Sequence, residues 1–96
     1  MLSQLPVNID KVKREELDKE ILRVGIIAEL DAVSLYEQLA AMTKNKLIQK
    51  VLLDIAKEEK THVGEFLTLL LMEDEEQVQE LDKGKKEIQE LSEETK

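Results

Sequence analysis

The chain has 96 residues, a formal net charge of -8 and no cysteine, which favours a single domain without disulfide bonds or thiolate metal sites. The strong acidity disfavours nucleic acid and an anionic membrane as partners, and the apolar run at residues 66–72 is too short to cross a bilayer. With 42% hydrophobic residues, 38% charged residues and only two aromatic side chains, the composition is typical of a helical protein that associates with a partner. No signal peptide is expected, because the N-terminus lacks a basic segment followed by an apolar one.

The first third of the chain is predicted to be an arm followed by a long helix. Residues 1–11 show no clear periodicity and contain Pro6, and Asp10 is the candidate N-cap of a helix over residues 12–42. One stripe of this helix, spaced in steps of three and four, consists of Leu22, Ile26, Glu29, Val33, Tyr36 and Ala40. Its single carboxylate is Glu29. A second apolar stripe runs beside the first and is interrupted by Asp31, so the helix is expected to contact more than one neighbour.

A turn and a second helix are predicted next. The turn is formed by Thr43, Lys44 and Asn45, and either Thr43 or Asn45 is expected to cap a helix over residues 46–72. The core stripe of this helix consists of Ile48, Leu52, Ile55, Glu59, His62, Phe66 and Leu69. Glu59 and His62 therefore lie where helix packing favours Leu or Ile. Because burial without a partner would cost them several kcal/mol, they need a compensating partner, and a metal ion is the simplest one.

Residues 74–96 are predicted to form a short third helix and a polar tail. Asp74 followed by Gln77 is typical of a capping box, and the helix carries a thin apolar stripe formed by Val78, Leu81, Ile88 and Leu91. Such a stripe cannot build a core alone, so the helix is expected to dock on its own hairpin or on a neighbouring subunit. The predicted division is an arm at 1–11, a helical hairpin at 12–73, and the third helix and tail at 74–96.

The two long helices bring three metal-ligand side chains to one height. Position 44, in the turn, lies midway between positions 29 and 59, so an antiparallel hairpin sets Glu29 level with Glu59. Glu59 and His62 form a Glu-x-x-His pair, which puts both on one helix face. Di-iron carboxylate bundles take one Glu from each of two helices and one Glu-x-x-His from each of the other two. The chain holds half of that set, and a twofold dimer would supply the other half.

Carboxylate and imidazole ligands suit Fe(II) or Mn(II), and zinc stays open as a substitute. Two Fe(II) ions held close by carboxylates can pass two electrons to one O2 or peroxide. Glu59 is the candidate bridge between the metals, and Glu29 and His62 are the candidate terminal ligands. A lone His on an apolar stripe is more often a core residue than a ligand. The metal site is nevertheless favoured, because Glu29 also interrupts an apolar stripe and is expected to lie level with Glu59 in the hairpin.

Two further residues near this site keep alternative interpretations. Tyr36 is either a hydrogen-bond donor or electron source beside the metal centre, or a core aromatic with a satisfied hydroxyl. Asp31 either forms a weaker cation site on the path by which metal reaches the centre or pairs with a lysine.

The motifs resemble those of the encapsulated ferritins, the ferritin-like, iron-oxidising cargo of encapsulin nanocompartments, and especially the archaeal form fused to an encapsulin shell. The resembling segments are AELDAVSLYEQ at residues 28–38 and EEKTH at residues 58–62. The resemblance implies that Glu29, Glu59 and His62 are the iron ligands. It also implies that Tyr36 is the tyrosine near the centre, and that Asp31 matches an acidic residue on the metal path.

The same resemblance implies homodimers that assemble into a larger ring, commonly a decamer, within a cytoplasmic encapsulin compartment. The sequence departs from the family at Ala28, where an acid can stand, and at Leu35, a family tryptophan position. Residues 90–96 do not resemble the apolar cargo-loading peptide. The chain is therefore interpreted either as a piece of a shell fusion or as a free-standing relative.

We predict an all-α protein: an antiparallel two-helix hairpin plus a short C-terminal helix, dimerising into a ferritin-like four-helix bundle. The predicted activity is that of a ferroxidase, oxidising Fe(II) to Fe(III) with O2 at a di-iron site shared across the dimer interface, with two Fe per interface. The iron would be stored in an encapsulin compartment. The alternatives are a rubrerythrin-like peroxide reductase, which the lack of rubredoxin-type cysteines disfavours, and a non-enzymatic helical interaction module with a structural metal.

Overall fold

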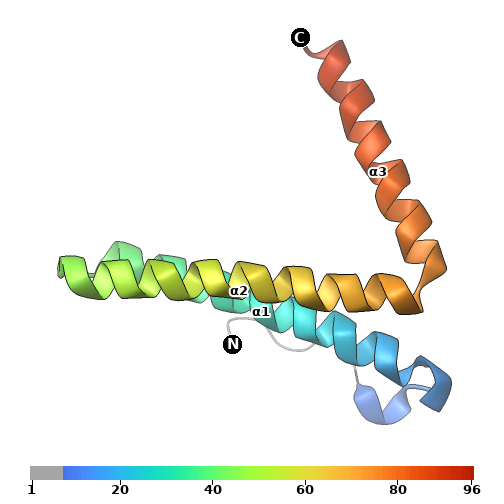
Figure 1. The fold of residues 1–96 in the computed structure, drawn as a ribbon, viewed down its shortest axis with the longest axis horizontal. Helices are drawn as coiled ribbons and strands as arrows, with labels where there is room; N and C mark the ends of the chain where they lie inside the picture. The colour runs from blue at the N-terminus through green and yellow to red at the C-terminus, as the bar shows by residue number, and fades with distance from the viewer. Residues whose placement is uncertain (1–7) are drawn as a thin grey trace.

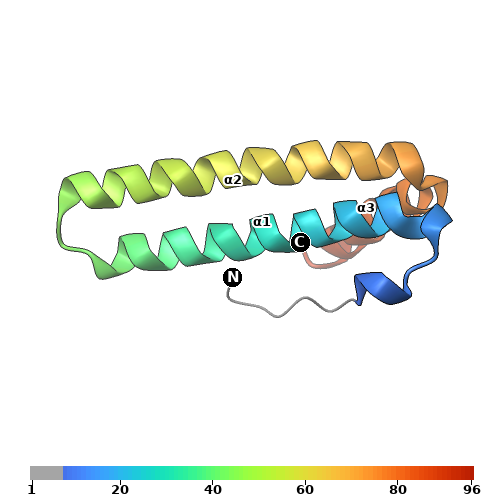
Figure 2. The ribbon, with the colours of Figure 1, turned by 90° about the horizontal axis from the view of Figure 1, so that it is seen from below.

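The computed structural model describes residues 8–96 and is helical over most of that range. Two 3-10 turns, Ile9–Lys11 and Arg14–Glu16, precede the helices α1 (Leu17–Met42), α2 (Lys46–Glu73) and α3 (Glu75–Glu94), and no strand occurs within residues 8–96. Helices α1 and α2 lie antiparallel and side by side (Figure 2). Helix α3 leaves one end of this hairpin at a steep angle (Figure 1). The predicted all-α fold, a hairpin followed by a third helix, is confirmed; the part of the N-terminal arm that holds Pro6 lies outside the described residues.

The first α-helix begins at Leu17, five residues later than predicted. Asp10 is not its N-cap but lies within the turn Ile9–Lys11, where its backbone N–H donates to Oδ1 of Asn8 at 3.1 Å. Lys13 has an extended backbone with ψ of 144°. Residues 13–16 are all charged, so they offer no apolar side chain to pack against α2. The α-helix begins directly after the turn Arg14–Glu16, at Leu17, which is apolar and partly buried.

The loop between α1 and α2 is closed by side chains that satisfy free backbone groups. Asn45 is the N-cap of α2, since its Oδ1 accepts from the backbone N–H groups of Leu47 and Ile48 at 3.0 and 3.1 Å. Thr43 Oγ1 accepts from the backbone N–H of Asn45. Gln49 Nε2 donates to the carbonyl of Ala40 at 3.3 Å and satisfies one of the last carbonyls of α1. The predicted turn is confirmed, and Asn45 rather than Thr43 caps the second helix.

The contact between α1 and α2 is narrow. The predicted first stripe of α1 is partly or fully buried against α2, with Ala40 at its most enclosed point. On α2, the buried residues are Ala56 and Leu70, each one position beyond the predicted stripe. Ile48 and Leu69, which belong to that stripe, are 50% and 47% exposed. Helix α2 is therefore rotated slightly about its axis relative to the prediction, and the predicted stripe lies at the edge of its contact with α1.

Gly25 allows the Phe66 ring of α2 to pack closely on α1. A Cβ atom at this position would lie 3.3 Å from three carbon atoms of the Phe66 ring, so the ring packs directly over the backbone of α1. A larger side chain at this position would require the Phe66 ring to shift.

A single chain leaves much of its apolar surface uncovered. Only Ala40, Ala56 and Leu70 form a buried apolar core in the described part of the chain, whereas fourteen large apolar side chains there are exposed. Exposed apolar surface on this scale is typical of a protein that buries it against a partner. Among the described helices, none is both long and apolar enough to pass through a membrane.

Helix α3 does not dock on its own hairpin. Residues 78–96 are exposed throughout, and the helix points away from α1 and α2 (Figure 1). Its predicted N-cap is confirmed, because Asp74 Oδ1 accepts from the backbone N–H of Gln77 at 3.0 Å. The helix continues to Glu94, so the polar tail beyond it consists of two residues, Thr95 and Lys96. Docking on its own hairpin is thus wrong, and docking on a neighbouring subunit stays a prediction.

Candidate metal centre

The side chains of Glu29, Glu59 and His62 meet between α1 and α2. One ligand atom from each lies within 4.8 Å of the other two. His62 Nδ1 is 3.4 Å from Glu29 Oε2 and 3.4 Å from Glu59 Oε2. This convergence follows from the turn at residues 43–45, which sets position 29 level with position 59, and from the one-turn step between Glu59 and His62.

The two carboxylates lie inside the cluster and the imidazole lies at its edge. The side chains of Glu29 and Glu59 are 20% and 19% exposed, whereas that of His62 is 45% exposed. Glu29 Oε2 is buried and accepts no hydrogen bond from the protein. A buried oxygen without a donor costs about 1–3 kcal/mol, and a bound cation would remove that cost.

The donor set of the cluster fits a divalent metal. Two carboxylates and one imidazole are ligands that suit Fe(II), Mn(II) or Zn(II). The nearby Lys60 does not neutralise the carboxylates, because its Nζ pairs with Glu37 Oε2 at 3.1 Å across the hairpin. The geometry therefore offers a negatively charged, partly enclosed site with three of the ligands that one metal needs. The assignment of the three residues as metal ligands stays a prediction.

Two other predicted site residues lie on α1 near this cluster. Asp31 is partly buried, two positions beyond Glu29, and is not a member of the three-residue cluster. Tyr36 is partly buried and lies seven residues beyond Glu29, which is about 10 Å along the helix axis. Tyr36 therefore sits two turns away from the cluster on the same helix. The roles of both residues stay predictions.

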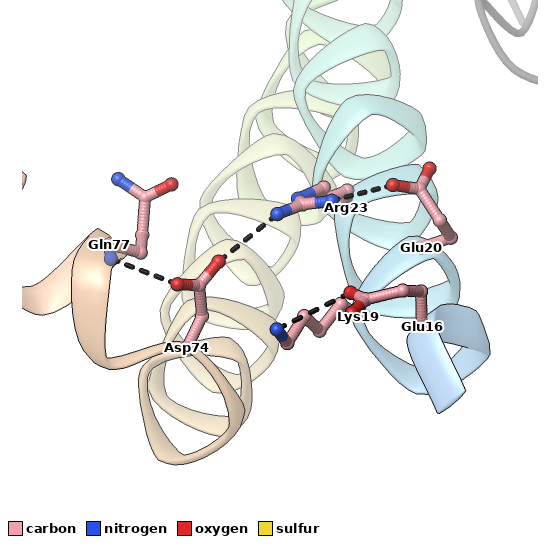
Figure 3. A network of polar contacts seen from close by, with 6 residues as sticks. All are labelled: Glu16, Lys19, Glu20, Arg23, Asp74 and Gln77. Carbon is pink, nitrogen blue, oxygen red and sulfur yellow. Dashed lines mark hydrogen bonds and ion pairs between the residues drawn. The ribbon is translucent and has the colours of Figure 1, made fainter. Parts of the chain in front are cut away.

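A second polar network, which the sequence analysis does not predict, lies at the corner between α2 and α3 (Figure 3). Arg23 of α1 pairs with Glu20 at 2.6 Å and with Asp74 at 3.0 Å. The hydrogen bond from the Gln77 backbone N–H, together with the charges of Lys19 and Arg23, lowers the pKa of Asp74. The bond to Glu20 in turn raises the pKa of Arg23. Arg23 and Asp74 are 51 positions apart, so no local pattern could have indicated their contact.

Comparison with known proteins assigns this helical chain to a family. The sequence model of the rubrerythrin family matches residues 20–96. The chain therefore belongs to the rubrerythrin family.

Two relatives narrow this placement. The chain is 53% identical over 94 residues to the ferritin-like-encapsulin shell fusion protein of Pyrococcus furiosus. That match covers 96% of the chain and 27% of the relative, so the chain spans about a quarter of the relative's length. The crystal structure of the encapsulated ferritin domain from Pyrococcus furiosus matches with a TM-score of 0.80 and 53% identity over 95% of each chain. The predicted resemblance to the encapsulated ferritins is confirmed.

Proposed function

We propose that the chain is a ferroxidase, which oxidises Fe(II) to Fe(III) at a centre that two copies of the chain complete together. The observation that carries this proposal is the cluster of Glu29, Glu59 and His62, in which a buried carboxylate oxygen has no hydrogen-bond donor. The family match supports it, because ferritin-like bundles with a Glu-x-x-His pair bind iron in this way.

The requirement for two copies is supported by the surface around His62. Ile48, Ile55, His62 and Leu69 are spaced seven residues apart and form one line along α2. Ile48, His62 and Leu69 are each about half exposed in the single chain. A second hairpin packed on this line would bury the apolar residues and bring its own Glu29, Glu59 and His62 to the same level. The pair of chains would then offer six ligands to two iron ions.

In this centre Fe(II) is the substrate and the side chains hold it for reaction with O2. Glu29 and His62 would each hold one iron, and Glu59 would lie between the two. Anionic oxygen ligands favour Fe(III) over Fe(II), so oxidation is favoured at this site. Each of two Fe(II) ions gives one electron to O2, which takes up two protons and leaves as hydrogen peroxide.

We propose that the product iron is stored in an encapsulin compartment. The supporting relative is, by its name, a fusion of a ferritin-like part to an encapsulin shell. Within residues 8–96 the chain forms one helical hairpin and a third helix rather than a closed shell, which is consistent with storage in a separate shell. We further propose that dimers assemble into a larger ring such as a decamer, and that the compartment is cytoplasmic.

The direct test of the activity is the rate of Fe(III) formation in Glu59→Ala and His62→Ala. We expect each substitution to lower the rate on the order of 100-fold, because each removes a ligand from the centre that the two irons share. Far-ultraviolet circular dichroism is expected to show that the helices are retained. Glu58→Ala and Glu65→Ala are the matched controls, since both residues are exposed on α2. If both ligand variants oxidise iron like the parent, the site assignment is wrong.

Because the chain matches the rubrerythrin family, the reduction of hydrogen peroxide is a second candidate activity. The two activities use the same ligands and differ in the oxidant. Stopped-flow oxidation of the ferrous protein by O2 and by hydrogen peroxide, at equal concentrations, separates them. A ferroxidase is expected to react at least as fast with O2, and a much faster reaction with peroxide would establish the reductase.

A further inference from the structure

The ring of Phe66 spans α1 and α2 one helical turn from the candidate metal centre. Phe66 lies four residues after His62 on α2, and Gly25 lies four residues before Glu29 on α1. Three ring carbons, Cδ1, Cδ2 and Cε1, lie at the same distance of 3.3 Å from the point that a Cβ of Gly25 would occupy. The ring therefore lies flat on the backbone of α1, at the end of the centre that is nearer to α3.

The ring is displaced along the hairpin toward the centre. Since Glu29 is level with Glu59, the position on α1 that is level with Phe66 is that of Leu22. The ring lies over Gly25, which is three residues, or about 4.5 Å along the helix axis, closer to Glu29. Helix side chains tilt toward the N-terminus of their own helix, which explains this displacement. The same tilt carries the Glu29 carboxylate toward Gly25, so the ring and the carboxylate approach each other between the helices.

Glu29 has a buried oxygen that the ring is placed to shield. Glu29 Oε2 is buried and accepts no hydrogen bond from the protein, and Phe66 is itself partly buried. A water molecule at that oxygen would donate the missing hydrogen bond and reduce the gain from binding a cation there. An apolar wall beside the oxygen keeps water away. It also strengthens the attraction between the carboxylate and a cation, because it lowers the local dielectric constant.

We propose that Phe66 closes this end of the centre against water and so reserves the Glu29 oxygen for a metal ion. The proposal rests on the proposed role of Glu29 as a ligand, and it adds a residue that is not itself a ligand. Phe66 acts through Glu29, so replacing its ring changes metal binding by admitting water and not by removing a ligand.

Thermal unfolding of the metal-free, full-length protein tests this coupling between Phe66 and Glu29. Glu29→Gln gives the buried group a donor of its own and is expected to raise the melting temperature of the parent. In Phe66→Ala, water already supplies that donor, so most of the rise should be lost. Leu67→Ala, at the next residue of α2 and also partly buried, is the matched control and should keep the full rise. An equal rise in all three backgrounds would overturn the proposal.

Binding of Mn(II) gives a second readout, which a loss of packing alone does not change. Phe66→Ala is expected to bind Mn(II) about tenfold more weakly than the parent, whereas Leu67→Ala should bind it as the parent does. The relaxation rate of water protons, measured per bound Mn(II), should rise in Phe66→Ala, because water then reaches the ion. Either an unchanged relaxation rate or an unchanged affinity would contradict the proposal.

A second variant keeps the test decisive if Phe66→Ala does not fold. Phe66→Leu keeps an apolar side chain but places no ring over Gly25, so it replaces the alanine variant in both experiments. Light scattering on each variant measures assembly, and loss of oligomers in the Phe66 variants but not in Leu67→Ala would overturn the proposal by assigning the ring to a contact between copies. A parent that binds no Mn(II) would contradict the metal centre itself. A parent that binds Mn(II) no better than its Phe66 variants would contradict only the shielding by Phe66.

Discussion

At the scale of single residues, Glu29 has the most unusual environment in the described part of the chain. Its Oε2 is the one buried side-chain oxygen there without a hydrogen-bond donor, and it lies beside a second carboxylate and an imidazole. Such an arrangement lowers the stability of the metal-free protein. The proposed binding of a metal would explain why this destabilising arrangement exists, because functional sites are often less stable than the rest of a protein.

Glu29→Gln should therefore have opposite effects with and without metal. The amide N–H can donate to Glu59 or to His62 Nδ1, so we expect the metal-free variant to be more stable than the parent by about 1–3 kcal/mol. The variant should also lose most of the rise in melting temperature that Mn(II) gives the parent. Thermal unfolding followed by circular dichroism, with a chelator or with Mn(II), measures both effects. Exposed Glu65→Gln is the control, and a metal-free variant less stable than the parent would contradict the argument.

At the scale of elements, the corner between α2 and α3 depends on one carboxylate. Asp74 caps α3 through the Gln77 backbone N–H and binds Arg23 of α1. These contacts lower the pKa of Asp74 below its ordinary value of 3.8. A group whose pKa is depressed by folding stabilises the folded state above its unfolded pKa, and this contribution is lost as the pH falls through the lower, folded pKa.

We accordingly expect the first turn of α3 to open as the pH falls below about 3.8. Between pH 5 and pH 7, the contribution of Asp74 to the stability of this turn should not change with pH. Asp74→Asn keeps an N-cap oxygen and removes the charge, so its α3 should lose less protection on acidification than that of the parent. Hydrogen exchange at the amides of the first turn of α3, between pH 5 and pH 2.5, measures this difference with intrinsic exchange rates corrected for pH. An identical pH dependence in both proteins would rule out Asp74 as the group responsible.

The elements themselves could largely be predicted from the sequence. Spacing in steps of three and four identified both long helices, and Asn45 and Asp74 marked helix starts through ordinary capping chemistry. The start of α1 is predicted too early because the backbone is extended at Lys13 and Arg14–Glu16 form a 3-10 turn, which the spacing of apolar residues does not indicate. The slight turn of α2 around its axis, and the long-range pair of Arg23 and Asp74, depend on tertiary packing and leave no periodic signal.

The candidate site could be predicted to the same extent. Glu29, Glu59 and His62 stood out as polar residues on apolar stripes, and their common height followed from the midpoint of the turn. The burial of one Glu29 oxygen and the outward position of His62 could not be predicted, because both depend on how α2 is rotated against α1. Tyr36 and Asp31 are predicted site residues on sequence position and resemblance alone, and their geometry around a completed centre depends on a second chain.

At the scale of the whole molecule, the account depends on association. The line of Ile48, Ile55, His62 and Leu69, in which Ile48 and Leu69 are about half exposed, would be the contact that completes the centre. Replacing both Ile48 and Leu69 with Glu should therefore give a monomer and lower the rate of Fe(II) oxidation at least tenfold, although all three ligands remain. Light scattering and the oxidation assay measure these effects, with exposed Thr68→Glu as the control. Full oxidation by a monomeric variant would contradict a shared centre.

The most direct measurement of the central claim is native mass spectrometry of the protein after anaerobic loading with Fe(II) and desalting. The shared centre predicts an oligomer with an even number of chains, carrying two irons for each pair. Glu59→Ala should lose both irons of a pair together. A metal-free monomer, or one iron held by each isolated chain, would contradict the shared centre and favour a helical interaction module with a structural metal.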